Sequence, residues 1–313
     1  MKIAVIDMGT NTFHLMLAEV MQDSAHIFHK ERVAVKIGEK GINQGRITEE
    51  AWLRAVDTIS GFKKKIEQSE ISTVFATATS AIRNATNGVD LTKEIERKTG
   101  IQTQIISGER EAQLILEGAR HALDLGSEKH LLMDIGGGSI EFIIADKAQT
   151  FWLKSFEVGG QRLVEKFHHS DPIAPTELND LDAYFMSELA ELIEQCQIHK
   201  PRTLVGCSGT FDTLSDMYCA TKNLVPTENQ TELPLSISAF NDIYKQLISK
   251  TRADRLVMPG MVEMRVDMIV VATALIHYLI KTLNITNLRV SAYALKEGVL
   301  FNTIASVRNS KKH

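Results

Sequence analysis

The chain has 313 residues, of which 44% are hydrophobic and 24% are charged, a composition typical of a globular protein rather than a disordered or collagen-like one. Its formal net charge of -4 excludes the global basic field that drives non-specific nucleic-acid binding, so we expect no nucleic-acid partner. The length favours two domains of ordinary size over one.

The cysteines and the apolar runs of the sequence indicate the cellular compartment in which the protein is expected. The cysteines form no Cys-x-x-Cys pair, which favours reduced thiols and argues against a zinc site; they are Cys196, Cys207 and Cys219. The apolar run at residues 3–6 is too short for a signal peptide, and the longest apolar region, 268–280, indicates a buried helix. We therefore expect a cytoplasmic protein with no membrane partner.

One pattern occurs twice in the chain. An apolar run ends in Asp-x-Gly at residues 3–9 and again at 131–136. Each copy precedes a second apolar stretch, 13–20 and 141–145, which is typical of a hairpin with small residues in its turn. Because each copy opens a stretch of domain length, the recurrence indicates a duplicated fold.

The remaining elements follow from hydrophobic periodicity and from helix start and stop signals such as Thr48 and Gly100. In the first half we expect a strand at 26–35, a helix at 48–68, a strand at 72–76, a helix at 89–98, a strand at 101–106 and a helix from about 108. In the second half we expect a strand at 150–156, a helix at 176–197, a strand at 203–206, a helix at 208–219, a loop at 222–236, a helix at 260–283, a strand at 288–291 and a helix from about 294.

Three strands followed by alternating helices and strands, repeated, predict an α/β fold. We expect two ribonuclease-H-like domains of the actin-like ATPase type, each a βββαβαβα unit, with a cleft between them. The predicted domains are 1–125 and 126–313, divided near Gly126, where a helix should break. The final helix, at about 294–313, is expected to pack back on the first domain.

Glycine-rich turns follow both Asp-x-Gly copies. Glycine lets a ligand approach the backbone N–H groups, and clustered N–H groups suit phosphate oxygens. Alone, the glycine run of the second copy is also compatible with a simple tight turn, but two equivalent turns favour phosphate binding. The candidate phosphate-binding residues here are Asp7, Gly9, Thr10, Asn11, Gly136, Gly137, Gly138 and Ser139.

Two acidic residues flank the second turn. A carboxylate beside a phosphate repels it unless a cation lies between them, so Asp134 and Glu141 are candidate ligands of Mg²⁺ or another divalent ion. In the alternative interpretation Asp134 caps a turn and Glu141 faces solvent.

A third turn, at residues 206–210, follows a predicted strand and begins a helix. Free N–H groups and the helix dipole favour an anion there, so Ser208, Gly209 and Thr210 are further candidate phosphate-binding residues. Simple helix capping by these small residues remains an alternative.

Several strings of the chain together resemble the exopolyphosphatase/guanosine pentaphosphate phosphohydrolase family in order and spacing. They are residues 7–12, 78–85, 106–112, 134–141 and 206–210, with further matches at 160–163, 258–261 and 291–300. The resemblance covers almost the whole chain.

The resemblance implies roles for two residues that would otherwise be ordinary. Glu111 corresponds to the catalytic glutamate that activates water, although by itself it would be a helix-surface residue. Arg83 corresponds to a phosphate-contacting arginine, although by itself it would be an exposed helix arginine. The family also implies a possible homodimer.

The chain departs from the family pattern in places. Many relatives carry a further C-terminal helical portion, and nothing of that length follows His313, so we expect the short two-domain form. Arg110 stands where many members have a second acidic residue. Ala292, Tyr293 and Lys296 replace the more usual residues near the end.

The resulting prediction is an enzyme that hydrolyses a terminal phosphoanhydride and releases orthophosphate from inorganic polyphosphate. Guanosine pentaphosphate presents the same terminal group and is the alternative substrate. An actin-like kinase or ATPase and a non-catalytic sensor of guanosine tetraphosphate are alternatives of other classes. The Ser-Gly-x-x-Glu-Ala string around Glu111 argues against the kinases, which lack that string together with the Arg83 block.

Overall fold

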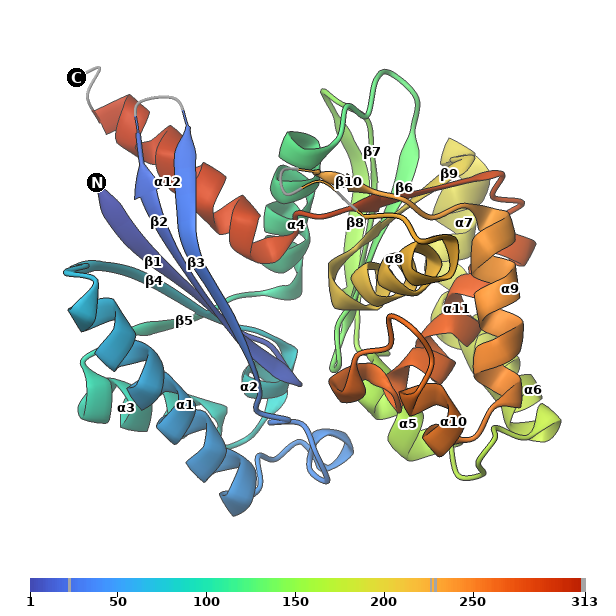
Figure 1. Cartoon of the computed structure of the whole chain (residues 1–313), viewed down its shortest axis with the longest axis horizontal. Helices are drawn as coiled ribbons and strands as arrows, with labels where there is room; N and C mark the ends of the chain where they lie inside the picture. The colour runs from blue at the N-terminus through green and yellow to red at the C-terminus, as the bar shows by residue number, and fades with distance from the viewer. Residues whose placement is uncertain (22–23, 226, 228–229, 311–313) are drawn as a thin grey trace. The chain divides into compact units, whose positions relative to one another are not determined.

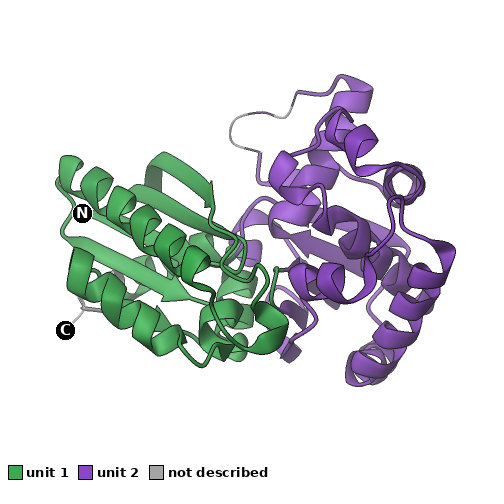
Figure 2. Ribbon diagram, turned by 90° about the horizontal axis from the view of Figure 1, so that it is seen from below, with its two compact units in different colours: residues 1–118, 136–138, 295–313 green, residues 119–135, 139–294 purple. Residues whose placement is uncertain are grey.

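The computed structural model describes residues 1–21, 24–225, 227 and 230–310. Two compact units account for the chain, coloured separately in Figure 2. The first unit comprises residues 1–118, 136–138 and 295–313, and the second comprises 119–135 and 139–294. The domain division predicted from the sequence stays a prediction, as does the predicted cleft.

The first unit is built on a 5-stranded sheet with the order β3-β2-β1-β4-β5. Its strands are β1 (Lys2–Met8), β2 (Thr12–Val20), β3 (Ala25–Ala34), β4 (Thr73–Ala78) and β5 (Thr103–Ile105). Its helices are α1 (Glu49–Gln68), α2 (Ser80–Asn84), α3 (Gly88–Thr99), most of α4 (Gly108–Ala122), α12 (Leu295–Ser310) and the 3-10 turn η1 (Ile42–Gln44). The first three strands pair antiparallel, and β1, β4 and β5 run parallel.

The second unit repeats this plan on a 6-stranded sheet with the order β10-β11-β9-β6-β7-β8. Its strands are β6 (His130–Ile135), β7 (Ile140–Ala145), β8 (Thr150–Phe156), β9 (Thr203–Cys207), β10 (Glu232–Leu233) and β11 (Asn287–Ser291). Its helical elements are α5 (Gly160–Phe167), α6 (Pro175–Glu188), α7 (Ala190–His199), α8 (Ser208–Lys222), α9 (Ile237–Ser249), α10 (Arg252–Leu256), η2 (Glu263–Arg265) and α11 (Met268–Thr282). Strands β6, β7 and β8 pair antiparallel, whereas β6, β9 and β11 run parallel. The duplicated ribonuclease-H-like fold of actin-like ATPases is thereby confirmed.

The alternating side chains of β1 divide the core of the first unit between two layers. Ala4, Ile6 and Met8 join the core formed with α1 and α3, which lie together on one face of the sheet in Figure 1. Ile3 and Val5 point to the opposite face because successive strand residues alternate, and α12 contacts β1 there. Full burial of each such aliphatic side chain contributes about 1.5–3 kcal/mol.

Helix α1 shows how local sequence sets an element. Thr48 is its N-cap, and Thr48 Oγ1 accepts a hydrogen bond from the Ala51 N–H at 3.3 Å. Ile59, Phe62 and Ile66 recur at helical spacing and are buried. The predicted start of this helix near residue 48 is therefore confirmed within one residue.

Three predicted elements are wrong in part. The helix expected at 176–197 is two helices, α6 and α7, separated at the buried Leu189, where no glycine or proline marks the break. The helix expected from residue 260 begins at Met268, because Gly260 adopts φ 81° and the chain then forms η2. The loop expected at 222–236 contains β10; Pro226 lies outside the described residues.

The apolar region near residues 268–280 forms α11, which is largely buried in the core of the second unit as expected. In the part of the chain that the structure describes, no helix has both the length and the apolar character needed to cross a bilayer.

Helix α12 approaches α4 so closely that residue 298 must lack a side chain. A Cβ at Gly298 would lie 1.8 Å from the Leu114 carbonyl oxygen. Glu297, which is 0% exposed, anchors the same end of α12: its carboxylate pairs with Lys30 Nζ at 3.2 Å and with Lys296 Nζ at 3.4 Å. This close approach fixes α12 within the first unit.

We expect Gly298→Ala to lower the free energy of unfolding by about 1–3 kcal/mol, because the methyl group forces α12 and α4 apart. Gly61→Ala is the matched control within α1, where a Cβ meets nothing within 4 Å. That change should instead stabilise the protein by about 0.5–1 kcal/mol. Urea unfolding followed by circular dichroism measures both, and equal effects of the two substitutions would contradict the close-packing argument.

Candidate functional site

The candidate residues of the first unit follow the ends of its parallel strands. Met8, Ala78 and Ile105 are register partners across β1, β4 and β5, so the carboxyl ends of these strands meet at one edge of the sheet. In open α/β sheets this edge is where ligands bind. Asp7 is the penultimate residue of β1, and the turn that carries Gly9 follows it directly.

The turn between β1 and β2 is braced by the segment that follows β3. The Gly9 N–H donates to the Thr12 carbonyl at 3.2 Å, which closes the turn. The Lys36 N–H donates to the Asn11 carbonyl at 2.8 Å, and the Gly38 N–H donates to the Thr10 carbonyl at 3.1 Å. These backbone bonds hold the candidate phosphate-binding turn in one conformation.

Residues 136–138 belong to the same compact unit as this turn. A Cβ at Gly138 would lie 2.5 Å from Ser80 Oγ and 2.6 Å from Thr10 Oγ1. A Cβ at Gly137 would lie 2.9 Å from Asn11 Oδ1. Two of the three predicted glycines therefore allow hydroxyl and amide groups to approach the backbone, as a phosphate cradle requires. Ser80 was absent from the predicted site residues.

Arg83 and Glu111 form an ion pair. Arg83 lies on α2 directly after β4, and its Nη1 donates to Glu111 Oε2 at 3.0 Å and to the Ile106 carbonyl oxygen at 3.1 Å. Glu111 lies in the first turn of α4, where the helix dipole favours a negative charge, and is only 8% exposed. The interpretation of Glu111 as an ordinary surface residue is therefore wrong. Arg83 fixes the orientation of this carboxylate.

The second unit holds two candidate carboxylates on adjacent strands. Asp134 on β6 and Glu141 on β7 are directly opposed in the antiparallel register. Ser208 Oγ donates to Asp134 Oδ2 at 2.6 Å, and Ser139 Oγ and Ser155 Oγ each donate to Glu141 Oε1 at 2.7 Å. Glu141 is 1% exposed, so the alternative in which it faces solvent is wrong.

The donor set of this carboxylate pair suits a hard divalent cation. Mg²⁺ is commonly held by one or two carboxylates together with waters and substrate phosphates. Among the described residues, no cluster of three or more histidine, cysteine, aspartate or glutamate side chains forms a fuller metal cage. Asp134 and Glu141 would therefore supply only part of a coordination shell.

The turn between β9 and α8 has the strand-to-helix geometry that was predicted for residues 206–210. Ser208, with φ 65°, begins α8, and Thr210 is buried in its first turn. A Cβ at Gly209 would lie 1.9 Å from Arg265 Nη2, so the glycine lets this guanidinium lie against the start of the helix. A positive side chain at a helix N-terminus suits an anion.

Arg265 is a candidate that sequence reasoning missed. It lies in η2, within a segment predicted to be helical, and only the tertiary fold brings it to Gly209. In the same turn, burial raises the pKa of the Cys207 thiol well above its usual value, and Asp134 and Asp212 raise it further. Cys207 is therefore a poor nucleophile.

The model of the Ppx/GppA phosphatase family matches residues 16–307 of the chain. The chain belongs to this family. One solved structure to which the chain is similar is a crystal structure described as an exopolyphosphatase from Cytophaga hutchinsonii ATCC 33406. The two chains are 42% identical, the alignment covers 98% of each, and the TM-score is 0.95.

Two curated relatives are more distant. A putative exopolyphosphatase of Haemophilus influenzae is 26% identical over 96% of this chain and 91% of the relative. A guanosine-5'-triphosphate,3'-diphosphate pyrophosphatase of Photobacterium profundum is 24% identical over 98% of this chain. The chain spans 60% of the length of the Photobacterium protein.

We expect a double-mutant cycle on Arg83→Gln and Glu111→Gln to give a coupling energy of about 0.5–3 kcal/mol, because both side chains are largely buried. Lys63 and Glu67 on α1 are a matched control, since they form an exposed pair that should couple by only about 0.3–0.5 kcal/mol. Unfolding of the four variants of each pair gives both values. Coupling no larger in the Arg83 cycle than in the control cycle would show that the pair does not restrain Glu111.

Proposed function

We propose that this chain hydrolyses the terminal phosphoanhydride of inorganic polyphosphate and releases orthophosphate. The observation that carries the proposal is the buried Glu111 carboxylate, oriented by Arg83 at the ligand-binding edge of the first sheet. The high similarity to the Cytophaga exopolyphosphatase along the whole chain supports polyphosphate as the substrate. The name of the more distant Photobacterium relative supports a guanosine polyphosphate as the alternative.

In the proposed reaction Glu111 accepts a proton from a water molecule. The water oxygen attacks the terminal phosphorus in line, and the bond from phosphorus to the bridging oxygen breaks. The products are orthophosphate and a chain shortened by one phosphate. Arg83 keeps the Glu111 carboxylate in a fixed direction, so the base needs no reorientation before it takes the proton.

The remaining candidates hold the phosphate. Backbone N–H groups and hydroxyls of the turns at residues 9–11, 136–139 and 208–210 would bind its oxygens, and Arg265 would add a positive charge. Asp134 and Glu141 would hold a divalent cation, and the chemistry of the donor set suits Mg²⁺. When bound, the cation would neutralise charge on the phosphoryl oxygens.

A cytoplasmic location and a homodimer belong to the proposal as well. The described cysteines are free and buried, which suits a reducing compartment. The homodimer is proposed from the family resemblance alone, and sedimentation analysis of the purified protein tests it directly.

We expect Glu111→Gln to lower phosphate release by about 10²- to 10⁴-fold, since the amide cannot accept the proton. Glu109→Gln is the control, because Glu109 is an exposed residue in the same helical turn. Long-chain polyphosphate, guanosine pentaphosphate and ATP are assayed in parallel with Mg²⁺. Polyphosphate turnover that survives Glu111→Gln would refute the assigned base. Turnover of ATP alone would favour the kinase or ATPase class, and no turnover of any substrate would favour the sensor.

We expect a chelator to abolish activity and Mg²⁺ to restore it. Asp134→Asn and Glu141→Gln should each raise the Mg²⁺ concentration for half-maximal activity by on the order of tenfold or more. Asp180→Asn, an exposed change on α6, is the matched control and should leave this concentration unchanged. An unaltered Mg²⁺ requirement in both carboxylate variants would remove these residues from the metal site.

A further inference from the structure

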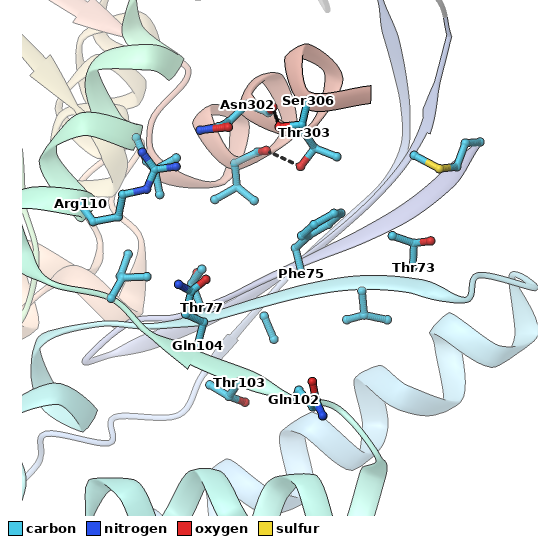
Figure 3. Close-up of a pocket in the computed structure, with 16 residues that line it drawn as sticks. Thr73, Phe75, Thr77, Gln102, Thr103, Gln104, Arg110, Asn302, Thr303 and Ser306 are labelled. Carbon is cyan, nitrogen blue, oxygen red and sulfur yellow. Dashed lines mark hydrogen bonds between the residues drawn. The ribbon is translucent and has the colours of Figure 1, made fainter. Parts of the chain in front are cut away.

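A pocket lies in the first unit, beneath α12, with a volume of about 710 Å³. Figure 3 shows side chains of α12 on one side of it and side chains of β4 and β5 on the other. Its lining includes Phe75, Gln104, Arg110, Leu114, Val299 and Asn302. None of the candidate catalytic or phosphate-binding residues lines it.

The pocket follows from how the two faces of the sheet are covered. Val74 and Ala76 of β4 pack toward the core of α1 and α3, so the alternating Phe75 and Thr77 point to the opposite face. There α12 packs tightly on α4 near Gly298. Farther along α12, the polar Asn302 and Ser306 replace apolar side chains that would fill the space over the sheet.

The charge of the lining favours an anion. Arg110 is its one ionisable side chain, and no aspartate or glutamate lines the pocket. Arg110 Nη1 donates to the neutral Gln113 Oε1 at 3.3 Å. Over the described ranges, the Arg110 guanidinium pairs with no carboxylate. An arginine fork that no acid neutralises can bind a carboxylate or phosphate through two parallel hydrogen bonds.

The rest of the lining suits a planar ring with polar edges. Phe75 contributes an aromatic surface at the centre of the view in Figure 3. The side-chain amides of Gln104 and Asn302 can each donate and accept, and within the described residues neither makes a side-chain hydrogen bond to the protein. The apolar Leu114 and Val299 complete a lining of mixed character, as is usual for small-molecule sites.

We propose that this pocket binds a small molecule that carries one anionic group on a planar, hydrogen-bonding ring, such as a nucleoside monophosphate. Its volume lies within the roughly 300–1,000 Å³ typical of ligand pockets. Arg110 binds the anionic group, Phe75 contacts the ring, and Gln104 and Asn302 bind the polar edge of the ring.

The pocket shares structure with the Arg83–Glu111 pair. Ile106 lines the pocket, and its carbonyl oxygen accepts the hydrogen bond from Arg83. Arg110 directly precedes Glu111 on α4. A ligand that binds the Arg110 guanidinium therefore contacts the helical turn that carries Glu111. This regulatory consequence rests on the proposed function, whereas binding itself does not.

Isothermal titration calorimetry with adenosine 5′-monophosphate tests the binding site. We expect binding to the wild type, weakened by about 10- to 100-fold in Arg110→Gln because a charge-assisted hydrogen bond is lost. Phe75→Leu should also weaken it. Arg97→Gln, at an exposed arginine of α3, is the control, and Asn11→Ala, at a candidate phosphate-binding residue, tests whether the nucleotide binds instead at the proposed active site. Both should leave the affinity unchanged.

Simpler probes identify the recognised groups. Adenosine and inorganic phosphate should each bind more weakly than the monophosphate, because each lacks one half of the ligand. Benzoate binding that Arg110→Gln weakens would support the class with a carboxylate as anion, and benzoate failure beside nucleotide binding would fix phosphate as the anion. No nucleotide binding, binding indifferent to Arg110→Gln, or binding lost in Asn11→Ala overturns the proposal. None of these results depends on polyphosphate turnover, so the two proposals fail separately.

Discussion

The burial of carboxylates is the constraint around which this protein is organised. Removing a carboxylate from water is costly unless hydrogen bonds or cations compensate for the lost hydration. Arg83 compensates Glu111, serine hydroxyls hold Glu141, and two lysines hold Glu297. Arg83, Ser155 and Lys30 each come from a different element than the carboxylate they contact, so these contacts tie strands and helices together. The same contacts thus serve function and stability. The proposed base, Glu111, is itself held by one of them, its ion pair with Arg83.

The repeated sheets could be predicted because their causes are local. Strand alternation, the Asp-x-Gly runs and the glycine turns all occur within a few residues, and so does the N-cap at Thr48. The predictions of secondary structure failed where tertiary packing determines the local conformation. The buried Leu189 divides a helical pattern without a breaker residue, and Gly260 begins a turn that packs against the Met217 backbone. Neither contact leaves a periodic signal in the sequence.

The candidate site also contains residues that the sequence could predict and residues that it could not. Glu111 and Arg83 could be named only from the family resemblance, since an acidic residue and a basic residue on helices are common. Their pairing at 3.0 Å gives a physical reason for that correspondence. Arg265 could not be predicted, because its position beside Gly209 depends on the turn that follows Gly260. The acidic pair was predictable in part, since its hairpin places Asp134 and Glu141 opposite each other.

The sequence position of α12 also has a consequence for synthesis. The first unit contains residues 1–118 and 295–313, so almost all of the second unit lies between its two segments. The outer face of β1 gains its cover from α12 only after the ribosome has made residues 295–310. The second unit, whose segments are nearly contiguous, can therefore bury its core before α12 is made. The core of the first unit lies within residues 4–101 and can form first, in the usual N-terminal-first order, but the unit that holds the proposed catalytic base is completed only when α12 docks.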